Sequence, residues 1–171
     1  MKRRPQLIVL AVLLALCVGG SALYLRATAE YPTLGDPVSE PVNQIEGFDL
    51  SIEAGPTWSP FRGYTLKYGI RIDSREVYYL TTGNEPHSAE TERLERLVDG
   101  QWHRLRSTAP TGFQSLTFDL GGSGSTGFGG SLVQKYEGYG TRLEPGTYRL
   151  VLELADQANQ PHYLAAEFNA E

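Results

Sequence analysis

A glycine-rich stretch, GGSGSTGFGG, is the part of the sequence most similar to a ligand-binding motif. Gly122, Gly124 and Gly127 form G-x-G-x-x-G, the spacing with which a dinucleotide-binding loop approaches a pyrophosphate. That fingerprint needs a strand before it and a helix after it. LTFDL supplies the strand, but FGGSLVQKY indicates another strand, and no Lys-Ser or Lys-Thr of a P-loop follows. We therefore predict a loop between two strands and no cofactor.

Histidines and serines also lack the arrangement that catalysis or metal binding requires. His87, His103 and His162 are scattered along the chain, without the spacing of a zinc site. No G-x-S-x-G nucleophile motif occurs, and the serines between 121 and 131 lie among glycines. We predict partly exposed surface histidines, no metal and no catalytic residue.

The carboxylates of one segment are interleaved with arginines. Glu90, Glu92 and Glu95 flank Arg93 and Arg96. An acid–base pair needs two carboxyl groups in different environments within a pocket, and nothing here predicts a pocket. The pattern indicates a solvated strand face with compensating charges.

Aromatic residues near glycine and proline are the strongest remaining sign of a binding surface. Trp58 lies in TWSPF, Phe128 lies in the glycine loop, and Tyr136 and Tyr139 lie in YEGYG. Exposed aromatics could stack on a sugar or fill a pocket of a partner. The alternative is a structural role, with Tyr136 in the core and Trp58 covering the end of the domain.

The elements that would position these residues are short strands. GYTLKYGIRID alternates apolar and polar residues over its whole length, which predicts a strand with one buried face. FDLSIE, EVYYLTT, SLTFDL, SLVQKY, TYRLVLEL and HYLAAEF are further candidates. Seven or eight short strands at regular intervals predict an all-β antiparallel sandwich.

SAETERLERLVDGQWHRL fits two structures. A helix capped by Ser88 and ended by Gly100 would place Leu94, Leu97 and Val98 on one face. A hairpin would instead turn at Asp99-Gly100, a pair suited to a two-residue type I′ turn. The regular spacing of the other strands favours the hairpin, with Trp102 as a structural residue on its second strand.

LEPGTY carries the most structural information. Its Leu-x-Pro-Gly-x-Tyr order is similar to the tyrosine corner of immunoglobulin-like sandwiches, in which a Tyr hydroxyl bonds back to the backbone. Here Tyr148 would donate that bond, Pro145 would set the turn, and Gly146 would permit a left-handed backbone.

Taken in order, four segments resemble the bacterial immunoglobulin-like domain of exported proteins from Gram-positive, clostridia-type bacteria. They are YTLKYGI, LERLVDGQWHRL, LEPGTYRL and YLAAEF. The resemblance implies an immunoglobulin-like sandwich on the cell envelope, and it transfers no catalytic residue. GGSGSTGFGG is longer than the usual connection of that family.

The N-terminus predicts a membrane segment. Lys2, Arg3 and Arg4 precede a run of 19 uncharged residues, Leu7 to Leu25, and a helix of that length approaches the ~30 Å hydrocarbon core. The flanking charges favour a cytoplasmic N-terminus, residues 1–6, and a single-pass signal-anchor at 7–25. A signal peptide cleaved after ATA, which ends at Ala29, is one alternative. A lipoprotein is another, although Leu16 before Cys17 opposes it.

Residues 26–46 contain three prolines and almost no apolar periodicity, so we predict an extended tether before a domain at 47–171. From Tyr31 onward, 11 Lys and Arg face 19 Asp and Glu, a net charge of −8, which argues against nucleic acid as a partner. Cys17 is the only cysteine, so the exported part holds no disulfide.

These observations predict a non-catalytic, membrane-tethered extracytoplasmic module with a structural, adhesive or ligand-binding role. Its partners would be the membrane and an envelope protein or glycan. The alternative is a module similar to protease inhibitors that presents the loop at 121–131, with Phe128 as its one apolar anchor.

Overall fold

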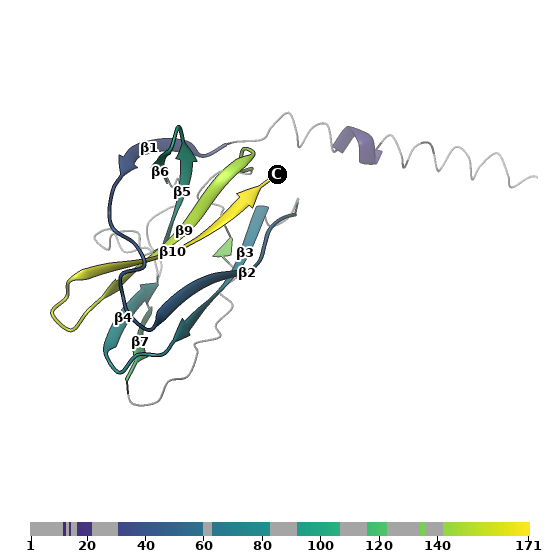
Figure 1. Cartoon of the computed structure of the whole chain (residues 1–171). Helices are drawn as coiled ribbons and strands as arrows, with labels where there is room; N and C mark the ends of the chain where they lie inside the picture. Colours follow the sequence, from purple (N-terminus) through teal and green to yellow (C-terminus); the bar gives the residue numbers. More distant parts are fainter. Residues whose placement is uncertain are drawn as a thin grey trace, which may run out of the picture. The chain divides into compact units, whose positions relative to one another are not determined.

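A computed structural model gives the fold of the chain. It describes residues 12, 14, 17–21, 31–59, 63–82, 92–106, 116–122, 134–135 and 142–171. The chain divides into two compact units, Met1–Glu30 and Tyr31–Glu171. The second unit is built of strands (Figure 1).

Every strand pair in the described part of this domain is antiparallel. In chain order the strands are β1 (Thr33–Val38), β2 (Phe48–Ser59), β3 (Gly63–Ile72), β4 (Val77–Thr82), β5 (Glu92–Val98), β6 (Gln101–Arg106), β7 (Leu116–Gly121), β8 (Gln134–Lys135), β9 (Gly146–Ala155) and β10 (Pro161–Ala170).

The strands form two sheets. The large sheet has the order β1-β6-β5-β9-β4-β7, with β10 on the other edge of β9, and the small sheet has the order β2-β3-β8. β9 is the centre of the large sheet. It pairs with β10 along its whole length, and its opposite edge pairs first with β5 and then, near Ala155, with β4. This arrangement confirms an all-β antiparallel architecture with sandwich character.

The core lies between the sheets and follows the predicted alternation. On β3, the inward positions are at most 5 % exposed, as are the inward positions of β9. These residues are Leu66, Tyr68, Ile70 and Ile72 on β3, and Tyr148, Leu150, Leu152 and Leu154 on β9. Each fully buried Leu or Ile contributes about 1.5–3 kcal/mol of transfer free energy, so these two strands supply a large part of the apolar core.

The ambiguous segment is a hairpin, as favoured from the sequence. Val98 pairs with Gln101 across the turn, and Asp99 and Gly100 have φ values of 50° and 80°. Positive φ at both central residues is the requirement of a type I′ turn. The helix alternative is wrong over Glu92–Val98, which is strand β5.

The backbone hydrogen bond predicted for the Tyr148 hydroxyl is present. Tyr148 is fully buried, and its hydroxyl donates a 2.7 Å hydrogen bond to the Glu144 carbonyl four residues upstream. Gly146 has a φ of 155°, on the positive side that favours glycine. The Tyr148 ring also stacks on Phe168 of β10 at 5.8 Å, so the corner is joined to the core.

The N-terminal boundary of the domain differs from the prediction. Residues 33–38, inside the predicted tether at 26–46, form β1 and pair with β6. The sequence concealed this strand because Pro37 and a register irregularity between Leu34 and Pro37 interrupt its alternation. Both features are tolerated on an edge strand. The domain therefore begins near Tyr31 rather than at Gly47.

The predicted membrane segment, 7–25, lies largely outside the described residues, as does the predicted cytoplasmic segment, 1–6. Val12, Leu14 and residues 17–21 are helical. Among the residues that the structure describes, no helix is long and apolar enough to cross a membrane.

Replacing Tyr148 by Phe removes the hydroxyl but keeps the buried ring. Because the Glu144 carbonyl loses its donor, we expect the free energy of unfolding to fall by about 1 kcal/mol or more. Urea denaturation of the purified chain measures this change. Tyr31→Phe, at a ring that is 48 % exposed, is the matched control and should change stability by less than ~0.5 kcal/mol. Identical midpoints for Tyr148→Phe and the wild type would contradict the structural role of the corner.

Candidate functional site

The outer face of the large sheet carries a buried cluster of charged side chains. Arg93 and Glu95 flank the core residue Leu94 on β5, and Arg149 precedes the core residue Leu150 on β9. Because strand side chains alternate in direction, these three point away from the small sheet. They are nevertheless only 1 %, 0 % and 6 % exposed, respectively. Charged side chains are almost never so buried unless they are paired.

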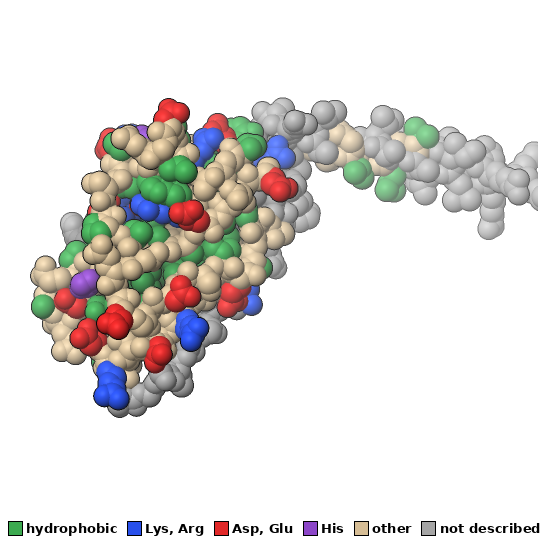
Figure 2. All heavy atoms as spheres, viewed as in Figure 1, with side chains coloured by type: hydrophobic (Ala, Val, Ile, Leu, Met, Phe, Trp, Pro, Cys, Tyr) green, Lys and Arg blue, Asp and Glu red, His purple; other side chains and the backbone are tan. Residues whose placement is uncertain are grey.

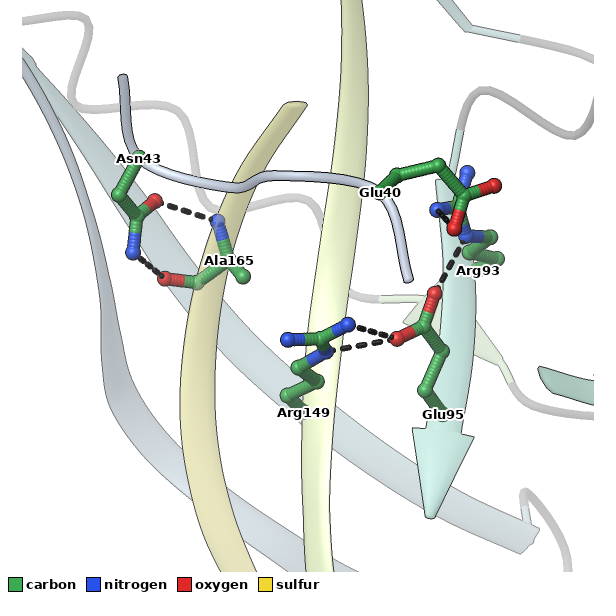
Figure 3. Close-up of polar contacts among 6 residues, drawn as sticks. All are labelled: Glu40, Asn43, Arg93, Glu95, Arg149 and Ala165. Atoms are coloured by element: carbon green, nitrogen blue, oxygen red, sulfur yellow. Dashed lines mark hydrogen bonds and ion pairs between the residues drawn. The ribbon is translucent and has the colours of Figure 1, made fainter. Parts of the chain in front are cut away.

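Glu95 is the centre of this cluster (Figure 3). Its Oε1 accepts a 2.7 Å hydrogen bond from Arg93 Nε. Its Oε2 accepts from Arg149 Nε at 2.6 Å and lies 2.6 Å from Arg149 Nη2. One carboxylate therefore joins two guanidinium groups on two adjacent strands by charge-assisted hydrogen bonds.

Strand register places further charges in the same row. Glu95 lies directly opposite Arg104 on β6 and opposite Arg149 on β9, and Arg149 lies opposite Glu167 on β10. Opposite charges at directly facing positions stabilise a sheet. The four strands thus carry an alternating row of charges across the outer face: Arg104, Glu95, Arg149 and Glu167.

Two aromatic rings cover the arginines. The Arg149 guanidinium lies 4.4 Å from the ring centroid of Trp102 on β6, and that of Arg93 lies 4.8 Å from the ring centroid of Tyr163 on β10. Such cation–π contacts strengthen when water is excluded. Trp102, predicted to be structural, is placed by the structure at the edge of this cluster.

Residues 39–45, between β1 and β2, cross the outer face, and we call them the strap. One end carries Glu40, whose Oε2 lies 3.7 Å from Arg93 Nη2 on β5. The other end carries Asn43, which bonds to β10. Because β9 lies between β5 and β10, the strap passes over β9, as Figure 3 shows.

Asn43 pairs with the edge of β10 much as a strand residue would. Its backbone N–H donates to the Tyr163 carbonyl at 2.8 Å. Its side-chain Nδ2 donates to the Ala165 carbonyl at 3.0 Å, and its Oδ1 accepts from the Ala165 N–H at 2.7 Å. The φ of Asn43 is 57°, a left-handed conformation that Asn tolerates better than most residues. These bonds occupy three polar groups on the open edge of β10.

The buried charges of the cluster balance, but some of its polar atoms lack hydrogen-bond partners among the described residues. Two arginines, 93 and 149, face two carboxylates, Glu95 and Glu40. Burial acts to lower the pKa of Arg93, but the hydrogen bond and charge of Glu95, with the charge of Glu40, raise it overall. Arg93 Nη2, Glu40 Oε2 and Arg104 Nε are buried without a hydrogen-bond partner within the described part of the chain. Such atoms are uncommon in folded proteins.

This arrangement corrects the sequence-based interpretation of the segment around Glu92. The charges there do compensate one another, but Arg93 and Glu95 are buried rather than solvated. The rings of Trp102 and Tyr163 cover the arginines, and the strap crosses the same face. The alternation of apolar and polar residues along one strand cannot reveal such a cover, because the cover is formed by residues far away in the sequence.

A second, partly buried carboxyl group lies on the inner face of β5. Glu92 Oε1 accepts a 2.8 Å hydrogen bond from the Tyr68 hydroxyl of β3, so this contact joins the two sheets. Desolvation by burial raises the pKa of Glu92, while the Tyr68 hydrogen bond opposes the shift. The folded protein therefore favours the protonated carboxyl more than an unfolded chain does.

The histidines have structural contacts. His103 Nδ1 lies 3.3 Å from the Gly35 carbonyl of β1, and His162 Nε2 lies 3.1 Å from Asp156 Oδ2. Asp156 also accepts from the Gln160 backbone N–H, which is the main cause of its lowered pKa. No three His, Cys, Asp or Glu side chains of the described residues are grouped closely enough to hold a metal ion. His87 lies outside the described residues.

The predicted binding aromatics are not brought together by anything the structure describes. Phe128, Tyr136 and Tyr139 lie outside the described residues. Trp58 is on β2 opposite Tyr64, and its side chain is outside the description. The residues missed from the sequence are those of the cluster, together with Glu40 and Asn43. The only sign of the cluster in the sequence is that Arg93 and Arg149 each directly precede a leucine of the core, Leu94 and Leu150.

The glycine loop is described only at its start. Gly121 and Gly122 have φ values of 95° and 99°, a region that L side chains rarely adopt. A Cβ on Gly121 would lie 2.1 Å from the Glu76 carbonyl oxygen. At Gly121, therefore, backbone conformation and close packing at the end of β7 require glycine.

Comparison with known proteins adds no relative. No family model matches the chain, and neither a curated protein nor a solved structure matches it. The arguments that follow therefore depend on the geometry described above.

Replacing Glu92 by Gln should change how stability depends on pH. Because the pKa of Glu92 is raised above its ordinary value of 4.5, its stabilisation is complete below that value and is lost as the pH rises through the folded-state pKa. The neutral Gln keeps an oxygen for Tyr68 and escapes this loss. We expect the stability of Glu92→Gln relative to wild type to increase from pH 4 to pH 7, measured by urea denaturation.

Subtracting wild type from variant at each pH removes the titration of every other group. Glu53→Gln, which changes an exposed ion pair with Lys67, is the matched control and should give a small difference. A Glu92→Gln difference that stays constant between pH 4 and pH 7 would contradict the raised pKa.

Proposed function

We propose that this chain is a membrane-tethered, extracytoplasmic module with an immunoglobulin-like sandwich and a ligand-binding role. The two antiparallel sheets and the tyrosine corner support the immunoglobulin-like fold. The uncharged run at 7–25, preceded by three basic residues, supports the anchor and its orientation.

The position of β1 shortens the tether in this proposal. Only five residues, 26–30, separate the uncharged run from Tyr31. A fully extended chain spans at most ~3.5 Å per residue, so this linker reaches no further than about 20 Å. The proposed tether is therefore short.

The observation that carries the binding role is the charged cluster on the outer face. The face of the domain in Figure 2 shows more acidic than basic side chains, yet two arginines are held almost completely buried beneath the strap. Buried ion pairs add little net stability, since desolvation offsets their attraction. Guanidinium groups held in fixed positions are, however, well suited to recognise a carboxylate.

The protease-inhibitor alternative depends on the loop at 121–131, of which residues 123–131 lie outside the described residues. No described contact favours it, so the ligand-binding role is the function proposed.

Membrane topology tests the tethered, extracytoplasmic part of this proposal. We expect the chain to sediment with membranes and the domain to be digested by protease added outside intact spheroplasts. Replacing Lys2, Arg3 and Arg4 by Glu should reduce that digestion, because it removes the basic flank that orients the segment. Arg75→Glu, at an exposed site in the domain, is the control.

The mass of the membrane-bound protein distinguishes a retained anchor from cleavage after Ala29. A domain protected from external protease but digested after lysis would contradict the extracytoplasmic location. A full-length chain found only in the soluble fraction would contradict the anchor.

A further inference from the structure

We call the surface beneath the strap, from Arg93 on β5 to Tyr163 and Ala165 at the edge of β10, the seat. Without Glu40, the buried charges of the seat would not be balanced. Glu95 is shared between Arg93 and Arg149, and Glu167, opposite Arg149, is exposed, so removing Glu40 leaves two buried cations with one buried carboxylate. An unpaired charge in a buried place is costly. The seat therefore requires a carboxylate near Arg93, whichever chain supplies it.

The other end of the seat requires a peptide-like group. The Tyr163 carbonyl and both backbone groups of Ala165 point to the open edge of β10, where Asn43 bonds to them. The Asn43 side chain supplies one donor and one acceptor, as any main-chain peptide unit does. An extended segment could make the same bonds with its own backbone, which is the basis of peptide binding at sheet edges.

The strap is held on this seat by polar contacts and buries little apolar surface. Pro41, Asn43 and Gln44 are exposed, and Glu40 and Val42 are only half-buried. The first buried apolar residue is Ile45, at the end of the strap. Little buried apolar area is therefore lost when residues 39–44 lift and Ile45 stays in the core.

Its carboxylate also fits imperfectly. Glu40 Oε2 and Arg93 Nη2 are 3.7 Å apart, and each is buried without a hydrogen-bond partner among the described residues. A carboxylate that approached Arg93 Nη2 within hydrogen-bond distance would satisfy a group that the strap leaves unsatisfied.

We propose that the outer face of the large sheet is a docking site for an extended segment of a partner protein that carries one carboxylate. The strap is then an internal mimic of that segment and blocks the site until it is displaced. The carboxylate binds Arg93, and a backbone peptide unit about three residues further along pairs with Ala165. This inference rests on the proposed ligand-binding role and names the chemical class of the ligand.

The test releases the strap and supplies its sequence in trans. The full chain in detergent carries Glu40→Ala and Asn43→Ala together, and the probe is a fluorescent peptide that copies residues 38–44, VSEPVNQ. We expect this variant to bind the peptide at least tenfold more tightly than the wild type, whose own strap competes for the seat. A peptide with Gln in place of Glu should bind about tenfold more weakly or worse, as expected for a lost charge-assisted hydrogen bond.

A matched control changes two exposed residues of the same connection. Glu46→Ala with Gln44→Ala removes one carboxylate and one amide of similar exposure, and it should bind the peptide no better than the wild type. Thermal melting confirms that each variant is folded. If Glu40→Ala with Asn43→Ala does not fold, Glu40→Gln replaces it, and the same tenfold preference for the Glu peptide is expected.

Three results would overturn the proposal. The first is a folded, released variant that binds the peptide no more tightly than the wild type. The second is equal binding of the Glu and Gln peptides. The third is a released variant that forms dimers which excess peptide does not dissociate, since the occupant would then be a second copy of this chain. None of these results bears on the membrane topology, which is tested separately in cells.

Discussion

The structure depends on one buried carboxylate held between two buried guanidinium groups. Glu95 accepts hydrogen bonds from Arg93 on its own strand and from Arg149 on the central strand β9. All three groups lie on the face of the sheet that turns away from the apolar core. Because buried charges are tolerated only when they are paired, this arrangement needs a cover that excludes water. The strap supplies that cover, and its ends are held by Arg93 and by the edge of β10.

Much of the sandwich could be predicted from the sequence because its signals are local. Alternation along β3 predicts a buried face, Asp99-Gly100 predicts the type I′ turn, and LEPGTY predicts the hydrogen bond of Tyr148. The strap and the cluster could not be predicted in this way. Asn43 bonds to Ala165, 122 residues away, and the prolines around it are equally typical of a tether. Arg93 and Glu95 alternate with leucines as solvated residues do, so only the distant strap shows that they are buried.

The same geometry links the fold to the proposed role. If the strap can be displaced, as proposed, the outer face that holds the buried Arg93 and Arg149 has two states, one blocked and one open. The strap follows β1 directly, and β1 begins three residues after the N-terminal unit ends at Glu30. The segment proposed to control access to the seat is therefore close in sequence to the proposed anchor, and lifting residues 39–44 would leave Ile45 in the apolar core.

The most direct test of this account is the stability of Glu95→Gln. Gln is nearly the same size but leaves the positive charges of Arg93 and Arg149 buried without their central carboxylate. We expect the free energy of unfolding, from urea denaturation at pH 7, to fall by about 3–5 kcal/mol. Glu53→Gln, at an exposed ion pair, should lower it by less than ~1 kcal/mol. A change of less than ~0.5 kcal/mol for Glu95→Gln would contradict the central role given to this carboxylate.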